Sequence, residues 1–268
     1  MPQPRRELAL LAQGFRRLQA SNPRDNCVVR RISSPSSIWG LLIAAAFLVS
    51  GSRVYAEDTL PARIDDRVFW QLIGALSEPD GDFQSENLLS NETEFPRIMA
   101  AVQRTVRPNG AYLGVGPEQN FNYIAVTHPK IAFLIDIRRQ NMLEHLLYKA
   151  IFELSPDRAV FISRLFSRKQ PQGLTGNLSA AELFDAYSGV PGDDETFKKG
   201  FAEIERLLFE THRFDLTTED RHVLERIYGA FFKYGPLIDY NSQGGGPSGG
   251  FFRPSYAQLM TEPDNAGK

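Results

Sequence analysis

Apolar residues in the first part of the globular sequence recur with the period of a helix. From Asp65 to Leu76 they fall every three or four residues, which predicts an amphipathic helix. Its expected inward face comprises Val68, Phe69, Leu72, Ile73 and Leu76. A second stripe predicts another helix, capped by Asn91 or Thr93 and ending at residues 108–110, Pro-Asn-Gly. That stripe comprises Phe95, Ile98, Met99, Val102 and Val106.

The pattern then changes to short, continuous apolar runs. Residues 111–115 and 131–136 are such runs, and they predict two buried strands, with a short helix at 121–126 between them. Two strands joined through a helix run parallel, so this stretch predicts a βαβ unit. We expect Asn141 to cap the next helix, which runs through Leu154.

The remainder of the chain is mostly helical. Ser179-Ala-Ala-Glu182 and Thr217-Thr-Glu-Asp220 resemble capping boxes, and residues 179–235 read as a helical insertion. Residues 237–240 are a candidate third strand, 243–250 a glycine-rich loop, and 255–260 a short helix. The predicted fold class is therefore α/β: an incomplete Rossmann-like parallel sheet with a helical insertion, in a domain spanning 57–268.

The turn after the first predicted strand is the candidate ligand site. Gly114 and Gly116 would let the backbone turn tightly and approach a ligand closely at the start of a helix. Asp136 closes the next strand, where a carboxylate can accept hydrogen bonds from both ribose hydroxyls of a nucleotide. Glu118, at the tip of the turn, is placed to contact an amine or hydroxyl of the ligand.

Each of these residues has an alternative interpretation. The glycine pair also suits a tight turn without a ligand, and Glu118 a solvated turn carboxylate. Asp136 also suits a helix cap, or a salt bridge to Arg138 or Arg139. Upstream, three polar residues could close over the site, although Asn91 also suits a plain helix cap. They are Asn87, Asn91 and Glu92.

The order strand, Gly114-x-Gly116 turn, helix, strand ending in Asp136 resembles class I S-adenosylmethionine-dependent methyltransferases. The resemblance covers residues 110–154 and implies S-adenosylmethionine as the cofactor. The third glycine usual in that motif is Glu118 here. The glycine of the dinucleotide fingerprint is Gln119, which disfavours pyrophosphate binding.

A closer resemblance is to an uncharacterised bacterial family with a Rossmann-like core. It is carried by residues 112–121, Tyr-Leu-Gly-Val-Gly-Pro-Glu-Gln-Asn-Phe, by 85–92, Ser-Glu-Asn-Leu-Leu-Ser-Asn-Glu, and by 136–139, Asp-Ile-Arg-Arg. Members of that family continue with further strands, so we expect this chain to be a C-terminally truncated member. The resemblance implies no established activity, and catalytic residues cannot be assigned from it.

The first 56 residues resemble an export signal. Residues 38–51 are a 14-residue apolar run without charge, shorter than the roughly 20 residues of a bilayer-spanning helix. Arginines precede the run, and Val54-Tyr55-Ala56 follows it, which predicts cleavage before Glu57 and a periplasmic product. The alternatives are an uncleaved anchor in the inner membrane and a buried core helix. The basic stretch is long for a signal, which a misassigned start near residue 28 would explain.

Composition removes several classes of protein. The single cysteine, Cys27, excludes an intrachain disulfide and a cysteine-based zinc site. Residues 1–37 carry seven arginines against two acids, but from Glu57 onward there are 22 basic and 30 acidic residues, which argues against nucleic-acid binding. No pair among the four histidines has metal-ligand spacing, and neither a P-loop nor a GxSxG elbow occurs, so we expect no metal.

The sequence thus predicts an exported, methyltransferase-like domain that binds a small ribose-bearing ligand between Gly114, Gly116 and Asp136. One alternative is a periplasmic binding module without enzymatic activity. Another is a truncated, non-functional product whose open strand edge invites aggregation. We expect membrane contact only through an uncleaved leader, and the sequence does not determine an oligomeric state.

Overall fold

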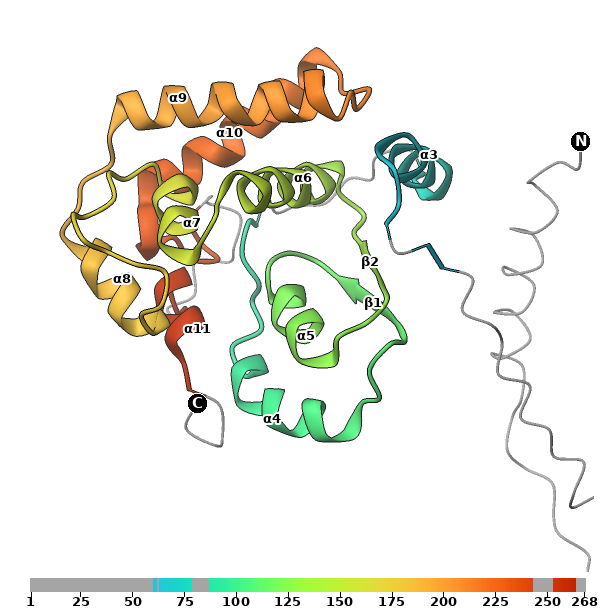
Figure 1. Ribbon diagram of the computed structural model, residues 1–268, viewed down its shortest axis with the longest axis horizontal. Coiled ribbons are helices and arrows are strands. Elements are labelled where there is room, and N and C mark those ends of the chain that lie inside the picture. Colours follow the sequence, from blue (N-terminus) through green and yellow to red (C-terminus); the bar gives the residue numbers. More distant parts are fainter. Residues whose placement is uncertain (1–59, 62, 79–86, 243–252, 264–268) are drawn as a thin grey trace, which may run out of the picture. The chain divides into compact units, whose positions relative to one another are not determined.

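The computed structural model describes residues 60–61, 63–78, 87–242 and 253–263 (Figure 1). The export signal, the turn predicted at 79–82 and the glycine-rich loop at 243–250 lie outside these residues. The chain divides into two units, 1–58 and 59–268, and all that follows concerns the second.

The described residues form a mixed α/β structure in which helices predominate. The first half holds α3 (Asp66–Leu76), α4 (Phe95–Thr105), β1 (Ala111–Val115), α5 (Gln119–Thr127), β2 (Ile131–Ile135) and α6 (Arg139–Leu154). The second half holds α7 (Arg158–Leu165), α8 (Ala180–Ser188), α9 (Asp194–Glu205), the π-helix η1 (Arg206–Thr211), α10 (Thr218–Tyr234), the 3-10 helix η2 (Gly235–Leu237) and α11 (Tyr256–Thr261).

The two predicted strands are present and parallel. Ala111 pairs with Ile131 and Val115 with Ile135, and α5 connects the strands (Figure 1). The prediction of a βαβ unit is confirmed in this coarse form. The prediction that both strands are buried is wrong, because Leu113 is 62% and Val115 70% exposed. Since parallel sheets are normally covered on both faces, this sheet has one open apolar face among the described residues.

The first helix forms where its period predicts it. Asp65 caps α3 by accepting a hydrogen bond from the backbone N–H of Val68 at 3.0 Å. Its expected inward face is wrong, however, because no residue of α3 is buried. Phe69 and Trp70 make its apolar contacts with the core.

Two predicted caps are also wrong. α4 begins after Glu94, without a side-chain cap, so neither Asn91 nor Thr93 caps it. α6 begins at Arg139, which places Asn141 inside its first turn. α4 ends at Thr105, three residues before the Pro-Asn-Gly turn that was predicted to end it, and Asn109 of that turn has a φ of 68°.

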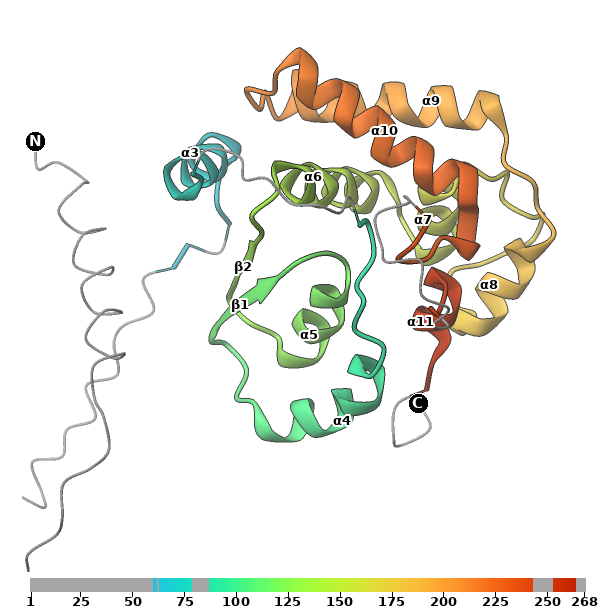
Figure 2. The ribbon, with the colours of Figure 1, turned by 180° about the vertical axis from the view of Figure 1, so that it is seen from behind.

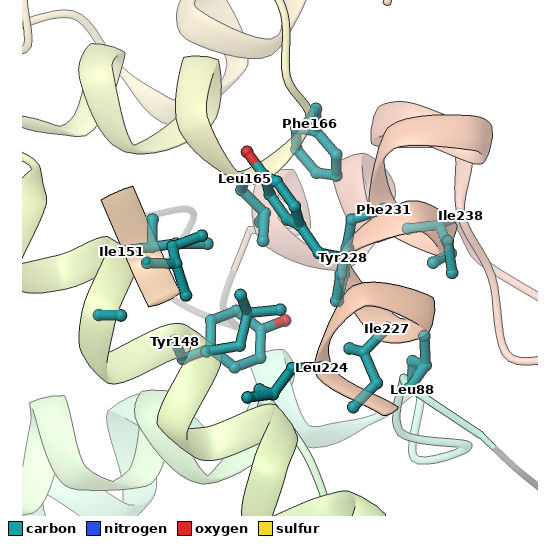
Figure 3. Packing of buried hydrophobic residues seen from close by; sticks show 14 of the residues in the cluster. Leu88, Tyr148, Ile151, Leu165, Phe166, Leu224, Ile227, Tyr228, Phe231 and Ile238 are labelled. Carbon is teal, nitrogen blue, oxygen red and sulfur yellow. The ribbon is translucent and has the colours of Figure 1, made fainter. Parts of the chain in front are cut away.

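Helices α6 to α10 enclose the main hydrophobic core. Both predicted capping boxes are present, at Ser179 with Glu182 and at Thr217 with Asp220. Figure 3 shows Tyr148 of α6 beside Leu224 and Phe231 of α10, all fully or almost fully buried. Within the described chain these helices are the main body of the domain rather than an insertion into a sheet.

The end of the described chain closes onto this helical body. No strand forms at 237–240; η2 occupies its start, and Ile238 is buried. The backbone N–H of Tyr256 donates to the carbonyl of Ile238 at 2.8 Å. The short helix predicted at 255–260 is present as α11, and Ser255 caps it. Figure 2 shows α11 beside α8 from the opposite side, and the two helices are in contact.

Candidate functional site

Gly116 and Asp136 follow the paired ends of the two strands. Val115 and Ile135 pair in register, and the backbone N–H of Gly116 donates to the carbonyl of Ile135 at 3.2 Å. Asp136 is the next residue after Ile135. The predicted turn and the predicted acid are therefore neighbours at the carboxyl edge of the sheet, the edge at which open α/β sheets bind ligands.

Gly116 forms the turn itself. Its φ of 82° lies in the left-handed region, which favours glycine. Its carbonyl oxygen accepts hydrogen bonds from Nδ2 of Asn120 at 3.0 Å and Nδ2 of Asn141 at 3.3 Å. Nε2 of His145 lies 3.0 Å from the same oxygen and must carry the proton, because a carbonyl can only accept.

Gly114 has a role inside the protein that needs no ligand. A Cβ at this position would overlap Oδ1 of Asn120 and the ring of Tyr112. The amide of Asn120 donates to the carbonyl oxygens of residues 115–117, at 2.8–3.2 Å, and accepts from the Tyr112 hydroxyl at 2.8 Å. The missing side chain of Gly114 thus makes room for Asn120, which holds the turn.

Glu118 is buried, so its interpretation as a solvated turn carboxylate is wrong. It is 1% exposed, and its two oxygens accept from the backbone N–H of Ser90 at 3.2 and 3.1 Å. Burial raises the pKa of Glu118 to about 7, although the hydrogen bond from Ser90 opposes the rise. The backbone of the segment that begins at Asn87 packs against the candidate site, whereas Asn91 and Glu92, two of the residues expected to close over it, are exposed.

Asp136 forms the ion pair with Arg138 that the sequence offered as an alternative. Oδ1 accepts from the backbone N–H of Arg138 at 2.9 Å and from its Nε at 3.1 Å, and Oδ2 accepts from Nη2 at 3.0 Å. Burial by itself raises the pKa of Asp136, but these hydrogen bonds outweigh it and lower the pKa below the usual value. Nη1 of Arg138 also donates to the carbonyl of Asn87, at 3.0 Å.

Glu144 is a buried acid of the site that the sequence interpretation missed. It is 0% exposed, and among the described residues neither of its carboxylate oxygens has a hydrogen-bond partner. Burial, with the nearby charge of Glu118, raises the pKa of Glu144 well above its usual value. Burial also favours the neutral ring of His145 and so lowers its pKa, although the hydrogen bond with Gly116 opposes this change.

The spacing of Asn141, Glu144 and His145 contains a signal for this arrangement. Residues three and four apart lie on one face of a helix, so these polar groups share a face of α6. Asn141 and His145 both contact the carbonyl oxygen of Gly116, and the charges of Glu118 and Asp136 act on Glu144. Polar residues at helical spacing among apolar ones therefore indicated where α6 faces the turn.

The edge combines a glycine turn, the ionised acid Asp136 and two buried acids, Glu118 and Glu144, whose raised pKa favours the protonated form. The ionised carboxylate can accept hydrogen bonds from hydroxyls and attract a positively charged group. Across the described residues, no cluster of three or more His, Cys, Asp or Glu side chains is arranged to hold a metal ion. No helix in the described part of the chain has the length and apolarity needed to cross a membrane.

Comparison with protein families gives one match. Residues 88–183 match a family described as a domain of unknown function, DUF7790. The match begins in the segment that contacts Glu118 and ends in α8, so it includes the whole candidate site except Asn87. Neither the curated proteins nor the solved structures include a match to the chain.

Proposed function

We propose that the domain binds a small ribose-bearing ligand at the carboxyl edge of β1 and β2, with S-adenosylmethionine as the candidate. The observation that carries the proposal is the position of Gly116 beside Asp136 at this edge. Gly116, at positive φ, turns the backbone from β1 toward α5, and Asp136 is an ionised acceptor for vicinal hydroxyls.

Ligand binding at this edge requires an exchange of hydrogen bonds. Both oxygens of Asp136 are held by Arg138, so ribose hydroxyls would take the place of Nε and Nη2. The backbone N–H of Arg138 can remain bound to Oδ1, which keeps the carboxylate oriented. A ligand with positive charge, such as a sulfonium or an amine, would favour ionisation of the buried acids Glu118 and Glu144, whose pKa values burial raises.

Isothermal titration of the full chain with S-adenosylmethionine, S-adenosylhomocysteine and NAD tests the proposal. We expect saturable binding of the first two ligands and none of NAD, because Gln119 stands at the glycine position of the dinucleotide fingerprint. Asp136→Asn should weaken binding at least about tenfold, since a hydrogen bond to a charged group contributes about 1.5–3 kcal/mol. Asp185→Asn, at an exposed position on α8, is the matched control. Absence of binding to the wild-type chain would overturn the proposal.

A second candidate is a binding module that performs no chemistry. The observation that favours it is the engagement of the edge groups within the chain itself: Glu118 holds Ser90, and Asp136 holds Arg138. Saturable binding of S-adenosylmethionine without methyl transfer to any added acceptor would support this candidate, whereas formation of S-adenosylhomocysteine would exclude it.

We further propose that the leader is cleaved after Ala56. Export with cleavage would place the domain in the periplasm, whereas S-adenosylmethionine is made and used in the cytoplasm. Evidence for the periplasmic location would therefore count against S-adenosylmethionine as the cofactor. Mass spectrometry of the amino terminus of protein purified from cells should give a chain that begins at Glu57, and an intact amino terminus would refute cleavage.

A further inference from the structure

His212 lies between two carboxylates from two different helices. Its Nδ1 is 2.9 Å from Oδ2 of Asp66 in α3, and its Nε2 is 2.8 Å from Oε2 of Glu153 in α6. The imidazole side chain is 5% exposed. An ionised carboxylate can only accept hydrogen bonds, so His212 donates to both acids at once only when each ring nitrogen carries a proton.

The backbone around His212 is unusual. The six residues before it form the π-helix η1, and Arg213 after it has a φ of 55°. π-helical turns are rare and frequent at functional sites, and a non-glycine residue at positive φ is uncommon. The chain thus departs from regular structure on both sides of the ring that joins the two acids.

α3 contacts the His212 ring through Asp66, and it contacts Phe214, which stacks on that ring, through two aromatic residues. No residue of α3 is buried, and its aromatic residues Phe69 and Trp70 pack on Phe214, with ring centroids 5.5 and 5.1 Å apart. Phe214 also stacks on the His212 ring, at 5.1 Å and an interplanar angle of 11°. The ion pair of Asp66 and the aromatic stack therefore hold α3 as one unit.

We propose that His212 is a pH-sensitive latch that holds α3 against the helical body while both ring nitrogens are protonated and releases it when one proton is lost. The lost proton passes to solvent, and a nitrogen lone pair then faces a carboxylate. The resulting repulsion replaces an attraction of opposite charges. Release of α3 separates Phe69 and Trp70 from Phe214 and exposes an apolar surface.

The two carboxylates and the charged groups near them set the low pH at which docking of α3 is lost. Lys149 of α6 pairs with Glu153 and lies over the Phe69 ring, and Arg63 acts on Asp66 from the segment before α3. The hydrogen bond from His212 lowers the pKa of Asp66. Burial raises the pKa of Glu153, but hydrogen bonds from Lys149 and His212 outweigh it and lower the pKa. Docking of α3 is therefore kept at mildly acidic pH and lost as the pH falls through these lowered values.

Trp70 reports the latch directly. The chain has two tryptophans, so Trp39→Phe in the full chain leaves Trp70 as the single emitter. Between about pH 5 and about pH 10 we expect a reversible shift of its emission to longer wavelength, while far-ultraviolet circular dichroism shows the helical body intact. His212→Gln should abolish this transition.

Two further variants make the test decisive. His222→Gln, at an exposed histidine 3.8 Å from Glu219, should keep the transition and serves as the matched control. If His212→Gln does not fold, Asp66→Asn removes one of the two carboxylates and should move the alkaline transition to lower pH. A transition that persists in His212→Gln, that does not move in Asp66→Asn, or that is lost in His222→Gln would overturn the proposal.

Discussion

The sheet and the helical body treat their apolar side chains differently. Leu147 in α6 is 0% exposed, whereas Leu113 in β1, a residue of the same type, is 62% exposed. Ile135, on the same face of the sheet, and Ile137, two residues beyond β2, are also more than half exposed. Packing therefore stabilises α6 to α10, whereas β1 and β2 are held mainly by their ladder, by the contacts of α5 and by polar groups at one edge.

The polar groups of the two regions differ in the same way. In the helical body, ion pairs such as Arg164 with Glu203 lie at the periphery of an apolar core. At the edge of the sheet, acids that are almost fully buried face one another. Proteins retain buried, unsatisfied groups at a cost, and such groups cluster where function requires them. Among the described residues, the pairing of the buried acids Glu118 and Glu144 therefore favours the edge as the candidate site.

The largest expected effect comes from the pair of leucines. Leu147→Ala should lower the free energy of unfolding by about 2–5 kcal/mol, because it leaves a cavity in a close-packed core. Leu113→Ala should change it by less than about 0.5 kcal/mol, as for exposed positions in general. Urea denaturation of the full-length variants measures both values. Equal losses would show that another part of the protein covers the sheet in solution.

Glu118 should make stability depend on pH in the direction opposite to an ordinary ion pair. Its pKa is about 7 in the folded state against a usual 4.5, so the folded state binds more protons between these values and stability falls as the pH rises. The loss amounts to about 3 kcal/mol, at about 1.4 kcal/mol for each unit of pKa.

Comparing urea denaturation at about pH 4.5 and about pH 7.5 tests this sign. Glu118→Gln should remove the part of the loss that Glu118 causes, about 3 kcal/mol, and Glu225→Gln, at an exposed position, should leave the loss unchanged. Glu144 contributes with the same sign and remains in both variants. A wild-type protein that becomes more stable across this interval, or a Glu118→Gln variant with the full pH dependence, would contradict the burial of Glu118.

A smaller effect is expected where β1 meets α5. Gly114→Ala should cost about 1–3 kcal/mol, because the added methyl group displaces Asn120 from the turn. Gly110→Ala, next to the start of β1, is the control, since a Cβ there meets no atom within 4 Å. Thermal unfolding of the two variants gives the difference. A neutral Gly114→Ala would indicate that Asn120 does not hold the turn in solution.

The sequence predicted those helices and strands that form because of residues close together in the chain. The apolar runs at 111–115 and 131–135 gave both strands, and Ser179 and Thr217 gave two helix starts, because a hydroxyl and an acid three residues apart suffice for a capping box. Gly116 and Asp136 were found for the same reason, since each directly follows a strand.

The remaining features depend on contacts that are distant in sequence. Glu118 is buried because Ser90, 28 residues earlier, covers it, and no local pattern encodes that contact. The strands carry the same continuous apolar runs as strands that are covered on both faces, so the sequence could not reveal the exposure of one face. His212 shows neither metal spacing nor a catalytic motif, and its partner Asp66 lies 146 residues away.

The central claim is that the glycine turn and the acid at the carboxyl edge form one ligand site. Amide chemical shifts of the isotopically labelled full chain, followed during titration with S-adenosylmethionine, test it at the atoms concerned. The account predicts saturable shifts at the backbone amides of Gly116 and Arg138, which donate to Ile135 and Asp136, and their loss in Asp136→Asn. Unchanged amide shifts at both residues, or shifts that persist in Asp136→Asn, would contradict it.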